Sequence, residues 1–278
     1  MKNHVVRTLA LLCFVVLAGC KPASKDQPWL GYGEGDFAYV SAPQAGWVTQ
    51  MKVERGTQVH RGDVLFVLDS TKEQAGTDQA QAQLAQARAS LKQENANLAY
   101  ARVTLDRQNR LARDNAGTPT ERDRALSDYR QSEQRIGQLR AQISQMEASL
   151  TGAAYSLTQR QVIAQTEGHV QDIYFREGEY LPASTPAVAI LPPRNVFVRF
   201  FVPETEFSRV HLGGKVRITC DGCKPVDATV TFIAAREEFT QPVIFSVGNR
   251  EKLVFKAEAR LPGGLPVHPG QPVEVRPL

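Results

Sequence analysis

A seven-residue apolar repeat in the middle of the chain constrains the fold more than any other feature. Apolar side chains recur every seven positions in two separate runs. The first run comprises Leu84, Leu91, Leu98, Leu105 and Ala112, and the second comprises Tyr129, Ile136, Ile143, Leu150 and Leu157. A stripe with this period is typical of the seam of a coiled coil, in which helices pack along one apolar face. We therefore predict two long helices.

A turn signal separates the two runs. Residues 115–119 read Asn-Ala-Gly-Thr-Pro, and Thr118 and Glu121 have the spacing of a capping box at the start of a helix. The two stripes are mirror images about position 120.5. This symmetry predicts an antiparallel hairpin over residues 72–158, with its tip at 113–121. Each arm of about 40 residues would be roughly 60 Å long at 1.5 Å per residue.

The faces opposite the stripes decide whether this hairpin stands alone. They carry Gln, Arg, Asp and Ser, with no second apolar stripe. The alternative, in which the two helices pack into a larger bundle, requires such a stripe. We therefore expect a free-standing coiled-coil hairpin.

A split repeat flanks the predicted hairpin. Residues 42–56 and 164–178 match at a constant offset of 122 positions, with glycines and apolar residues in the same places. Alternating apolar residues between glycines predict a strand, a turn and a strand. Neither half buries its apolar face alone. We therefore predict one small β-sandwich formed by residues 37–71 and 159–192.

The last third of the chain has the pattern of a β-domain. A short helix is predicted at 203–210, where two glycines follow. Four β-branched or aromatic runs predict strands, at 196–202, 215–219, 228–234 and 253–259. A turn and a final strand close this domain, which spans 193–278.

The repeat and its insertion resemble a known family. The two half-repeats are similar to the halves of a biotinyl/lipoyl domain. A helical hairpin between such halves resembles the hemolysin-D-type periplasmic adaptors, or membrane fusion proteins, and the chain looks nearest to YbhG-like adaptors of ABC exporters. The resemblance implies an elongated, multi-domain α+β fold. It would consist of a split lipoyl-like β-sandwich with an inserted antiparallel α-helical coiled-coil hairpin, followed by a β-barrel domain.

The resemblance also implies a function, which is not that of an enzyme. Family members bridge an inner-membrane transporter to an outer-membrane channel, and several copies form a ring. For this chain the resemblance implies an ABC transporter, with a proton-driven pump as the runner-up, together with a TolC-like channel and a homo-oligomeric ring. Because the chain stops at Leu278, just after the barrel, we expect a membrane-proximal domain to be absent or rudimentary.

Three residues at the predicted tip match the pattern of adaptors that dock TolC-like channels. Arg107, Leu111 and Thr118 reproduce the Arg-x3-Leu-x6-Ser spacing, with threonine in place of serine. The resemblance therefore assigns them to channel docking. Arginine donates several hydrogen bonds to carbonyls or carboxylates, and leucine fills a seam between helices. A structural reading stays open, in which Thr118 only caps the second helix and Leu111 belongs to the core.

The first twenty residues predict export. A basic start and an apolar core form a signal peptide over 1–19, and the sequence Leu-Ala-Gly-Cys at its end resembles the lipobox of bacterial lipoproteins. Cys20 would then carry a lipid anchor in the periplasm, followed by a tether over 20–36. We favour the inner membrane, although Lys21 leaves the choice of membrane open. An ordinary secretory signal that contains a cysteine is the alternative.

Cys220 and Cys223 form a Cys-x-x-Cys motif in the last third. Such a pair can be redox-active, can supply half of a zinc site, or can form a structural disulfide. A zinc site needs about four ligands, and the nearest histidines are His211 and His268. After export to an oxidising compartment we expect a disulfide that clamps the turn.

Two other functions remain as alternatives. In carrier domains, a lysine between the two halves takes biotin or lipoate, and Lys72 lies near that place. Lys72 opens the predicted helix and does not occupy an exposed tight turn. A carrier subunit of an enzyme complex is therefore only the second hypothesis. A coiled-coil scaffold lipoprotein is the third. The sequence offers no motif for a catalytic, cofactor or metal site.

Composition excludes several broad classes. A net charge of +4 gives no reason to expect a nucleic-acid partner. The mean hydropathy of −0.31, with no apolar run near the length of a membrane span, excludes a polytopic membrane protein. Hydrophobic residues make up 42% of the chain, which excludes a wholly disordered chain.

Overall fold

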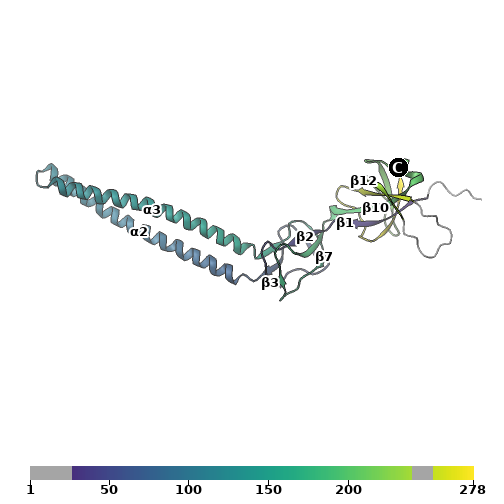
Figure 1. Ribbon diagram of the computed structural model, residues 1–278, viewed down its shortest axis with the longest axis horizontal. Coiled ribbons are helices and arrows are strands. Elements are labelled where there is room, and N and C mark those ends of the chain that lie inside the picture. The colour runs from purple at the N-terminus through teal and green to yellow at the C-terminus, as the bar shows by residue number, and fades with distance from the viewer. Residues whose placement is uncertain (1–26, 240–252) are drawn as a thin grey trace, which may run out of the picture. The chain divides into compact units, whose positions relative to one another are not determined.

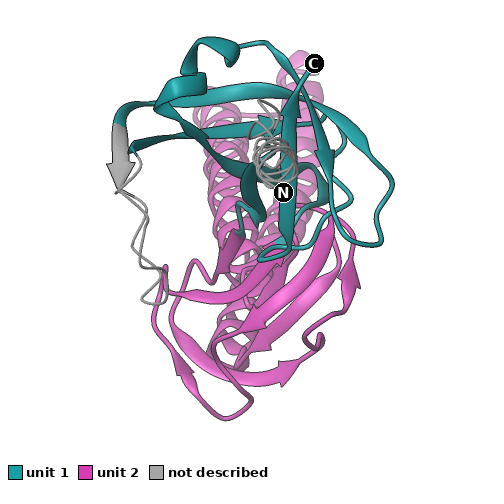
Figure 2. Cartoon of the chain, turned by 90° about the vertical axis from the view of Figure 1, so that its right-hand side faces the viewer, with its two compact units in different colours: residues 1–37, 191–278 teal, residues 38–190 magenta. Residues whose placement is uncertain are grey.

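The computed structural model describes residues 27–239 and 253–278 (Figure 1). The chain divides into two compact units (Figure 2). Residues 38–190 form one, and the described residues of the ranges 27–37 and 191–278 form the other. The predicted signal peptide and Cys20 lie outside the described residues. The fold class is α+β, with a helical hairpin, a β-sandwich and a closed β-barrel.

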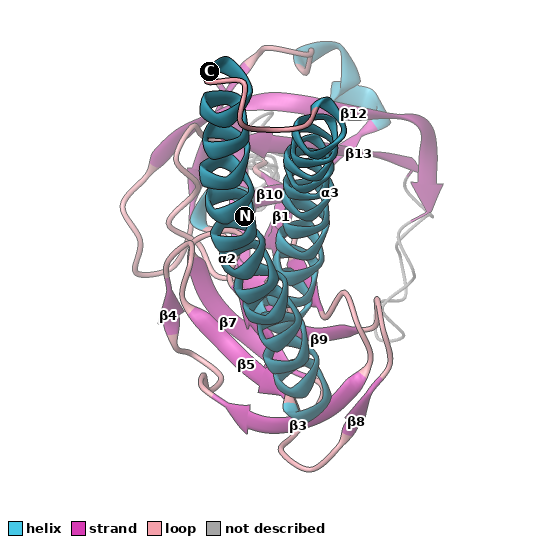
Figure 3. Ribbon diagram, turned by 90° about the vertical axis from the view of Figure 1, so that its left-hand side faces the viewer, coloured by secondary structure: helices cyan, strands magenta, loops and turns pink. Residues whose placement is uncertain are grey.

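Two long helices form the hairpin. Helix α2 spans Thr71–Arg113 and helix α3 spans Pro119–Thr158, and the two run antiparallel, side by side (Figures 1 and 3). The chain folds back over residues 114–118. This is about one helical turn before position 120.5, where the chain would fold back if the matching residues of the two stripes lay directly opposite one another. In an antiparallel pair the side chains of one stripe fit between those of the other, rather than opposite them, and this shifts the register.

The seam between α2 and α3 is narrow. The buried apolar side chains on these helices are mostly small: Ala80, Leu84, Ala87, Ala101, Ala125 and Ile136. Other stripe residues, such as Leu91, Leu98 and Leu105, are half-buried. A two-helix hairpin covers each stripe from one side only, so large residues at its margin keep part of their surface in water.

The β-sandwich consists of two sheets that enclose one core. The first sheet has the order β2-β9-β7-β4, formed by Ala38–Ser41, Pro186–Leu191, Gly168–Ile173 and Gln58–Val59. The second has the order β6-β5-β3-β8, formed by Gln161–Ile163, Val64–Leu68, Gly46–Met51 and Tyr180–Leu181. Each sheet contains strands from both halves of the split repeat. The core between them includes Val48, Phe66, Val170 and Val188.

The backbone hydrogen bonds of the sandwich repeat with the offset seen in the sequence. The N–H of Gly56 donates to the carbonyl oxygen of Val170 at 2.7 Å. At positions 122 residues later and earlier, the N–H of Gly178 donates to the carbonyl oxygen of Val48 at 2.8 Å. Gly56 and Gly178 both have positive φ, at 87° and 83°, a conformation that glycine adopts without steric cost. The two half-motifs therefore form one sandwich with an internal pseudo-two-fold repeat.

The other unit is a closed barrel with the strand order β1-β10-β13-β12-β11-β14. These strands are Trp29–Gly35, Val196–Pro203, Leu253–Arg260, Val226–Phe239, Lys215–Thr219 and Pro272–Pro277. A short 3-10 helix, η1 (Pro193–Asn195), precedes β10, and a second, η2 (Glu204–Arg209), follows it. The barrel encloses its own apolar core, which includes Trp29, Phe200 and Val275.

Strand β1 lies within the stretch that the sequence assigns to the tether. Its Trp29 is buried, stacks on Phe200 with ring centroids 5.7 Å apart, and donates its indole N–H to Glu206. A Cβ on Gly31 would lie only 2.4 Å from the carbonyl oxygen of Arg199. The glycines of this stretch therefore allow neighbouring backbones to approach β1 closely, and residues 29–35 belong to the barrel.

Candidate functional site

The hairpin tip begins where α2 ends in a Schellman motif. The N–H of Ala116 donates to the carbonyl oxygen of Leu111 at 2.8 Å, and the N–H of Asn115 donates to that of Ala112 at 3.4 Å. Asn115 has a φ of 56°, the left-handed conformation that this motif needs and that asparagine tolerates. The carbonyl oxygens of Leu111 and Ala112 are thus satisfied by the turn itself.

Helix α3 begins with a complete capping box. The hydroxyl of Thr118 accepts a hydrogen bond from the N–H of Glu121 at 3.3 Å, and the Thr118 N–H donates to the Glu121 carboxylate at 3.3 Å. The same hydroxyl donates to this carboxylate at 2.8 Å. Pro119 occupies the first turn, where its missing N–H costs nothing. The capping that the sequence predicts at Thr118 is therefore present.

Gly117 closes the turn against the end of α2. A Cβ added to it would lie 3.1 Å from the Cβ of Leu111 and 3.4 Å from the backbone nitrogen of Ala112. Leu111 is 36% exposed, because its side chain lies partly under this turn. The tip is a compact structure whose shape is defined by local hydrogen bonds and one close approach.

The three predicted docking residues have different environments at this tip. Thr118 is occupied by the capping box, and Leu111 is packed against the turn. Arg107 lies six residues before the end of α2 and is exposed. Within the described chain it makes no hydrogen bond or ion pair. Arg107 is therefore the member of the three with its hydrogen-bond donors facing solvent.

Two further arginines make the end of α2 positively charged. Arg110 and Arg113 lie in its last turn and are exposed. Together with Arg107 they are spaced three residues apart along the chain. This spacing is visible in the sequence, but Arg110 and Arg113 are not part of the Arg-x3-Leu-x6-Ser docking pattern. Cations at a helix C-terminus are also favoured by the helix dipole. The tip thus presents three exposed arginines, Arg107, Arg110 and Arg113, which we call the tip arginines.

The middle of the hairpin holds one buried charge. The Glu94 side chain lies in the seam, at the position where the heptad has Ala87 one repeat earlier. Asn97 donates to its carboxylate at 3.1 Å, and the Arg135 guanidinium on α3 lies 3.9 Å away. A carboxylate in a two-helix seam needs such partners, since an unpaired buried charge is costly. The apolar repeat gives no sign of this residue.

The root of the hairpin is held by a buried ion pair. Arg160, just after α3, contacts Glu73 in the first turn of α2 at 2.5 Å, and both side chains are only about a tenth exposed. Its guanidinium also donates to the carbonyl oxygen of Ala45, before β3, at 2.9 Å. The carbonyl oxygen of Arg160 accepts from the N–H of Leu68 at 2.8 Å. Arg160 therefore connects both helices to the sandwich; we call this arrangement the root clamp.

The protonation of Glu73 follows from the same contacts. Burial alone would raise the pKa of its carboxyl group, but the hydrogen bond and positive charge of Arg160 outweigh burial and hold that pKa below its ordinary value. The Glu73 carboxyl group is therefore ionised at neutral pH.

Lys72 occupies the second position of α2 and is exposed. The strand before it, β5, ends at Leu68 and leads into the helix rather than into a tight hairpin. This environment differs from the exposed turn that the carrier reading requires.

Cys220 and Cys223 form a disulfide in the turn between β11 and β12, with their Cα atoms 5.3 Å apart. Gly222, within the loop, has a φ of 78°, which explains a glycine at this place. In the described ranges, the structure brings together no group of three or more His, Cys, Asp or Glu side chains able to hold a metal ion. Across those same residues, no helix combines the length and apolarity of a membrane span.

Comparison with known proteins identifies relatives along the whole chain. The chain is 31% identical to the macrolide export protein MacA of Escherichia coli O157:H7 over 208 residues, which cover 73% of the chain and 56% of that protein. It is 28% identical to the UPF0194 membrane protein YbhG of Salmonella arizonae over 320 aligned residues, with 96% of the chain and 97% of that protein covered. The chain spans 41% of the length of an uncharacterized protein of Haemophilus influenzae. No family model matches.

Solved structures share the fold. The crystal structure of MacA from Actinobacillus actinomycetemcomitans aligns with a TM-score of 0.70 at 19% identity, over 91% of this chain and 78% of that chain. The periplasmic adaptor EmrA aligns with a TM-score of 0.50 at 15% identity, over 91% of this chain and 98% of that chain.

Proposed function

The chain belongs to the family of periplasmic adaptors, or membrane fusion proteins, and on this premise we propose that it links an inner-membrane transporter to an outer-membrane channel in a tripartite efflux or secretion system. The proposed work is mechanical rather than catalytic. The protein would seal a conduit across the periplasm and couple one membrane component to the other.

One observation carries this proposal. Two helices of 43 and 40 residues form a single hairpin between the halves of a β-sandwich, and the hairpin ends in a compact, locally defined tip. A 43-residue helix is about 65 Å long, so the tip can act far from the sandwich. A helix pair of this length with polar outer faces adds little to a core, which supports a role in reaching a distant partner.

The tip would dock a TolC-like channel through residues with distinct roles. The tip arginines would donate hydrogen bonds to carbonyl or carboxylate groups of the channel, with Arg107 making the central contact. Leu111 would pack against the channel's helices with the part of its surface that remains exposed. Thr118, whose hydroxyl already bonds to Glu121, would act by holding the tip in shape.

The remaining partners are assigned by resemblance. We propose an ABC transporter as the inner-membrane partner, because the sequence looks nearest to YbhG-like adaptors, and a proton-driven pump is the runner-up. Several copies would form a ring around the conduit. The mature chain would lie in the periplasm, anchored through a lipid on Cys20, with the inner membrane favoured.

Photocrosslinking in cells tests the docking role. A photoreactive amino acid is placed at Arg107, and a matched control is placed at Gln93, which lies two heptads earlier on the same face of α2 and is exposed. We expect an outer-membrane channel to be captured from position 107 and not from position 93. Capture of no channel from either position would favour the scaffold lipoprotein, and an intact mass with biotin or lipoate on Lys72 would favour the carrier subunit.

A further inference from the structure

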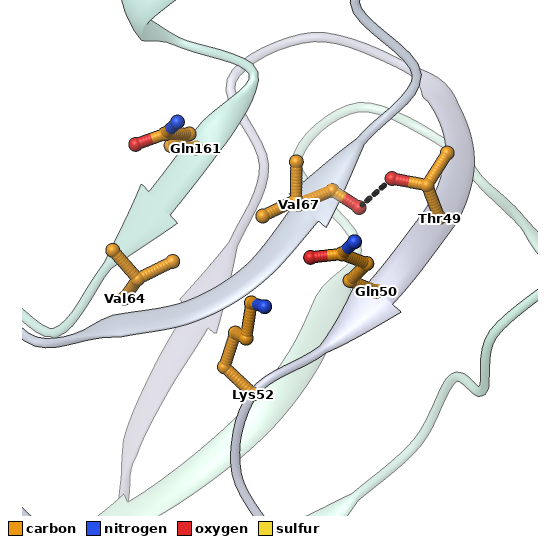
Figure 4. A pocket seen from close by; sticks show the side chains of 6 residues that line it. All are labelled: Thr49, Gln50, Lys52, Val64, Val67 and Gln161. Atoms are coloured by element: carbon orange, nitrogen blue, oxygen red, sulfur yellow. Dashed lines mark hydrogen bonds between the residues drawn. The ribbon is translucent and has the colours of Figure 1, made fainter.

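Two of the surface hollows in the described chain differ in the chemistry of their lining. One lies on the sandwich, over β6, β5 and β3, and has a volume of about 510 Å³ (Figure 4). Its lining consists of Thr49, Gln50, Lys52, Val64, Val67 and Gln161. The other lies on the barrel, has a volume of about 400 Å³, and includes Cys220 of the disulfide in its lining. A disulfide is a bond that a thiolate can break and re-form, so the hollow on the barrel lies beside a reactive group.

The strand register of the barrel forms the hollow beside Cys220. Thr219 of β11 pairs with Glu274 of β14, which in turn pairs with Leu30 of β1. Leu30 is 68% exposed, so the hollow has an apolar margin open to solvent. Cys220 also packs against the barrel core. We call this place the barrel hollow; it is lined by Leu30, Thr219, Cys220, Asp221, Pro272, Val273 and Glu274.

The turn that carries the disulfide is also held by other contacts. The N–H of Cys223 donates to the carbonyl oxygen of Cys220 at 3.2 Å, and Gly222 supplies a positive φ within the turn. On the flanking strands, Arg217 donates two hydrogen bonds to the Asp227 carboxylate, at 2.7 and 3.0 Å. Strand β11 also pairs with β14 on its other side. The turn should therefore keep its shape when the bond between the sulfurs is broken.

The disulfide closes a very short loop. Only Asp221 and Gly222 lie between the two cysteines. A disulfide stabilises a fold mainly by restricting the unfolded chain, and a short loop restricts it least. Breaking this bond should therefore leave the barrel folded, and the bond can change its redox state without the cost of unfolding.

The two sulfur atoms have different surroundings. Cys220 packs against the apolar core and is followed by the exposed Asp221, and both features disfavour a thiolate at Cys220. Cys223 is followed by the exposed Lys224, whose positive charge favours a thiolate. The sulfur that is more stable as a thiolate is the better leaving group in disulfide exchange. Attack should therefore occur at Cys220, which lines the barrel hollow, and Cys223 should leave.

We propose that Cys220 and Cys223 form an exchangeable redox centre, which takes two electrons from a dithiol protein that approaches through the barrel hollow. The partner's thiolate attacks the Sγ atom of Cys220, the bond between the two sulfurs breaks, and its electron pair passes to the Sγ atom of Cys223. The partner's second thiolate then attacks its own sulfur in the mixed disulfide and releases Cys220. The barrel ends with two thiols, which carry the two protons of the partner's thiols, and the partner ends with one disulfide.

The apolar margin of the barrel hollow favours a protein as the partner. The exposed side chain of Leu30 lies beside the bond that is broken. Covering such a side chain stabilises a contact with a protein surface, whereas a small thiol covers little of it. The inference goes beyond the proposed adaptor function and does not depend on it.

Reduction of the folded chain tests whether the bond is exchangeable. The purified full chain is treated with dithiothreitol without denaturant, free thiols are capped with iodoacetamide, and mass spectrometry reports the state of Cys220 and Cys223. We expect both to become capped while the near-ultraviolet circular dichroism of the barrel, where Trp29 stacks on Phe200, stays unchanged. Reduction that occurs only in denaturant, or loss of the dichroism signal on reduction, would overturn the proposal.

A trapping experiment tests the approach through the barrel hollow. The probe is purified thioredoxin whose second active-site cysteine is replaced by serine, so that the mixed disulfide persists. We expect a linked product on a non-reducing gel, with thioredoxin attached to Cys220 and iodoacetamide on Cys223. Leu30→Glu should slow its formation about tenfold, because it places an unpaired charge in the contact. Leu212→Glu is the matched control, since Leu212 is 67% exposed on the same barrel and does not line the hollow.

The remaining results separate the hollow from the bond itself. Dithiothreitol should reduce the wild-type chain and both leucine variants at the same rate, because a small thiol needs no apolar contact. Attachment of thioredoxin to Cys223, equal rates of trapping in the two leucine variants, or slower reduction of Leu30→Glu by dithiothreitol would each overturn the assigned approach. The capture of a channel from position 107 tests the adaptor function separately, so failure of one proposal is distinguishable from failure of the other.

Discussion

Removing Arg160 should destabilise the root of the hairpin strongly, because its guanidinium holds both Glu73 and the carbonyl oxygen of Ala45. In Arg160→Met, the Glu73 carboxylate stays in a largely buried place without its cation, and the carbonyl oxygen of Ala45 loses its donor. Removing one partner of a buried pair costs about 3–5 kcal/mol. Since both side chains remain about a tenth exposed, we expect a loss near the lower end, about 3 kcal/mol.

A double-mutant cycle measures how much of this loss belongs to the pair. Glu73→Leu should cost a similar amount, because it leaves the guanidinium unpaired. The double variant Glu73→Leu with Arg160→Met should lose no more than either single variant, since replacing both charges by apolar side chains removes the uncompensated charge. The assay is urea unfolding of the mature chain followed by the helical circular-dichroism signal, which the hairpin dominates.

Acid titration of the same proteins provides an independent test. The pKa of Glu73 is held below its ordinary value of 4.5 in the folded chain. The root clamp therefore contributes its stability fully above about pH 4.5 and loses it as the pH falls through the folded-state pKa. The wild-type chain should lose stability relative to the double variant over that range. Additive losses in the cycle, or a loss under about 0.5 kcal/mol in Arg160→Met, would refute the reasoning.

Three further predictions concern local structure. Thr118→Ala should destabilise the start of α3 by about 1 kcal/mol, and hydrogen exchange should show faster opening of residues 119–122, whereas Thr118→Ser should retain the wild-type rates. Gly31→Ala should destabilise the barrel, because its Cβ would meet the carbonyl oxygen of Arg199, and thermal unfolding should show a lower transition temperature for the barrel. Gly76→Ala in α2 should instead stabilise the hairpin by about 1 kcal/mol, since nothing lies within 4 Å of the new Cβ. Replacing both Cys220 and Cys223 by serine should remove the short closed loop and lower barrel stability by about 2 kcal/mol, whereas an unchanged midpoint in denaturant would show that the bridge adds nothing.

The hairpin was predictable because its determinants are local and periodic. The seven-residue stripe defines which faces of α2 and α3 meet, and Thr118, Pro119 and Glu121 mark where the second helix begins. Each of these signals acts within a few residues of itself. The register was predicted less well, since the way two stripes interdigitate depends on the partner helix and not on either stripe alone.

The tether assignment shows where local composition misleads. The sequence assigns residues 20–36 to the tether, but Gly31, Gly33 and Gly35 have no side chains and allow close packing inside the barrel. Strand β1 pairs with β10 and β14, both far away in the chain. Its membership in the barrel is therefore a property of tertiary contacts.

The candidate site divides in the same way. The docking pattern at Arg107, Leu111 and Thr118 came from spacing, and these three residues remain a prediction for the photocrosslinking experiment. The division of roles among them was not visible in the sequence. Leu111 is half-covered by the turn at Gly117, and Thr118 is occupied by Glu121, which leaves the arginine as the exposed donor.

By itself, the sequence determined the helical hairpin, the split repeat and the capped tip, because heptads, repeated glycines and capping residues act over short distances or through strict periodicity. Tertiary structure alone decided the root clamp and the place of β1. Arg160 and Glu73 are 87 residues apart, and β1 pairs with β10 and β14, which are both far away in the chain. Such residues acquire a common environment only when the chain has folded, since nothing in their local sequence records which distant side chain will lie beside them.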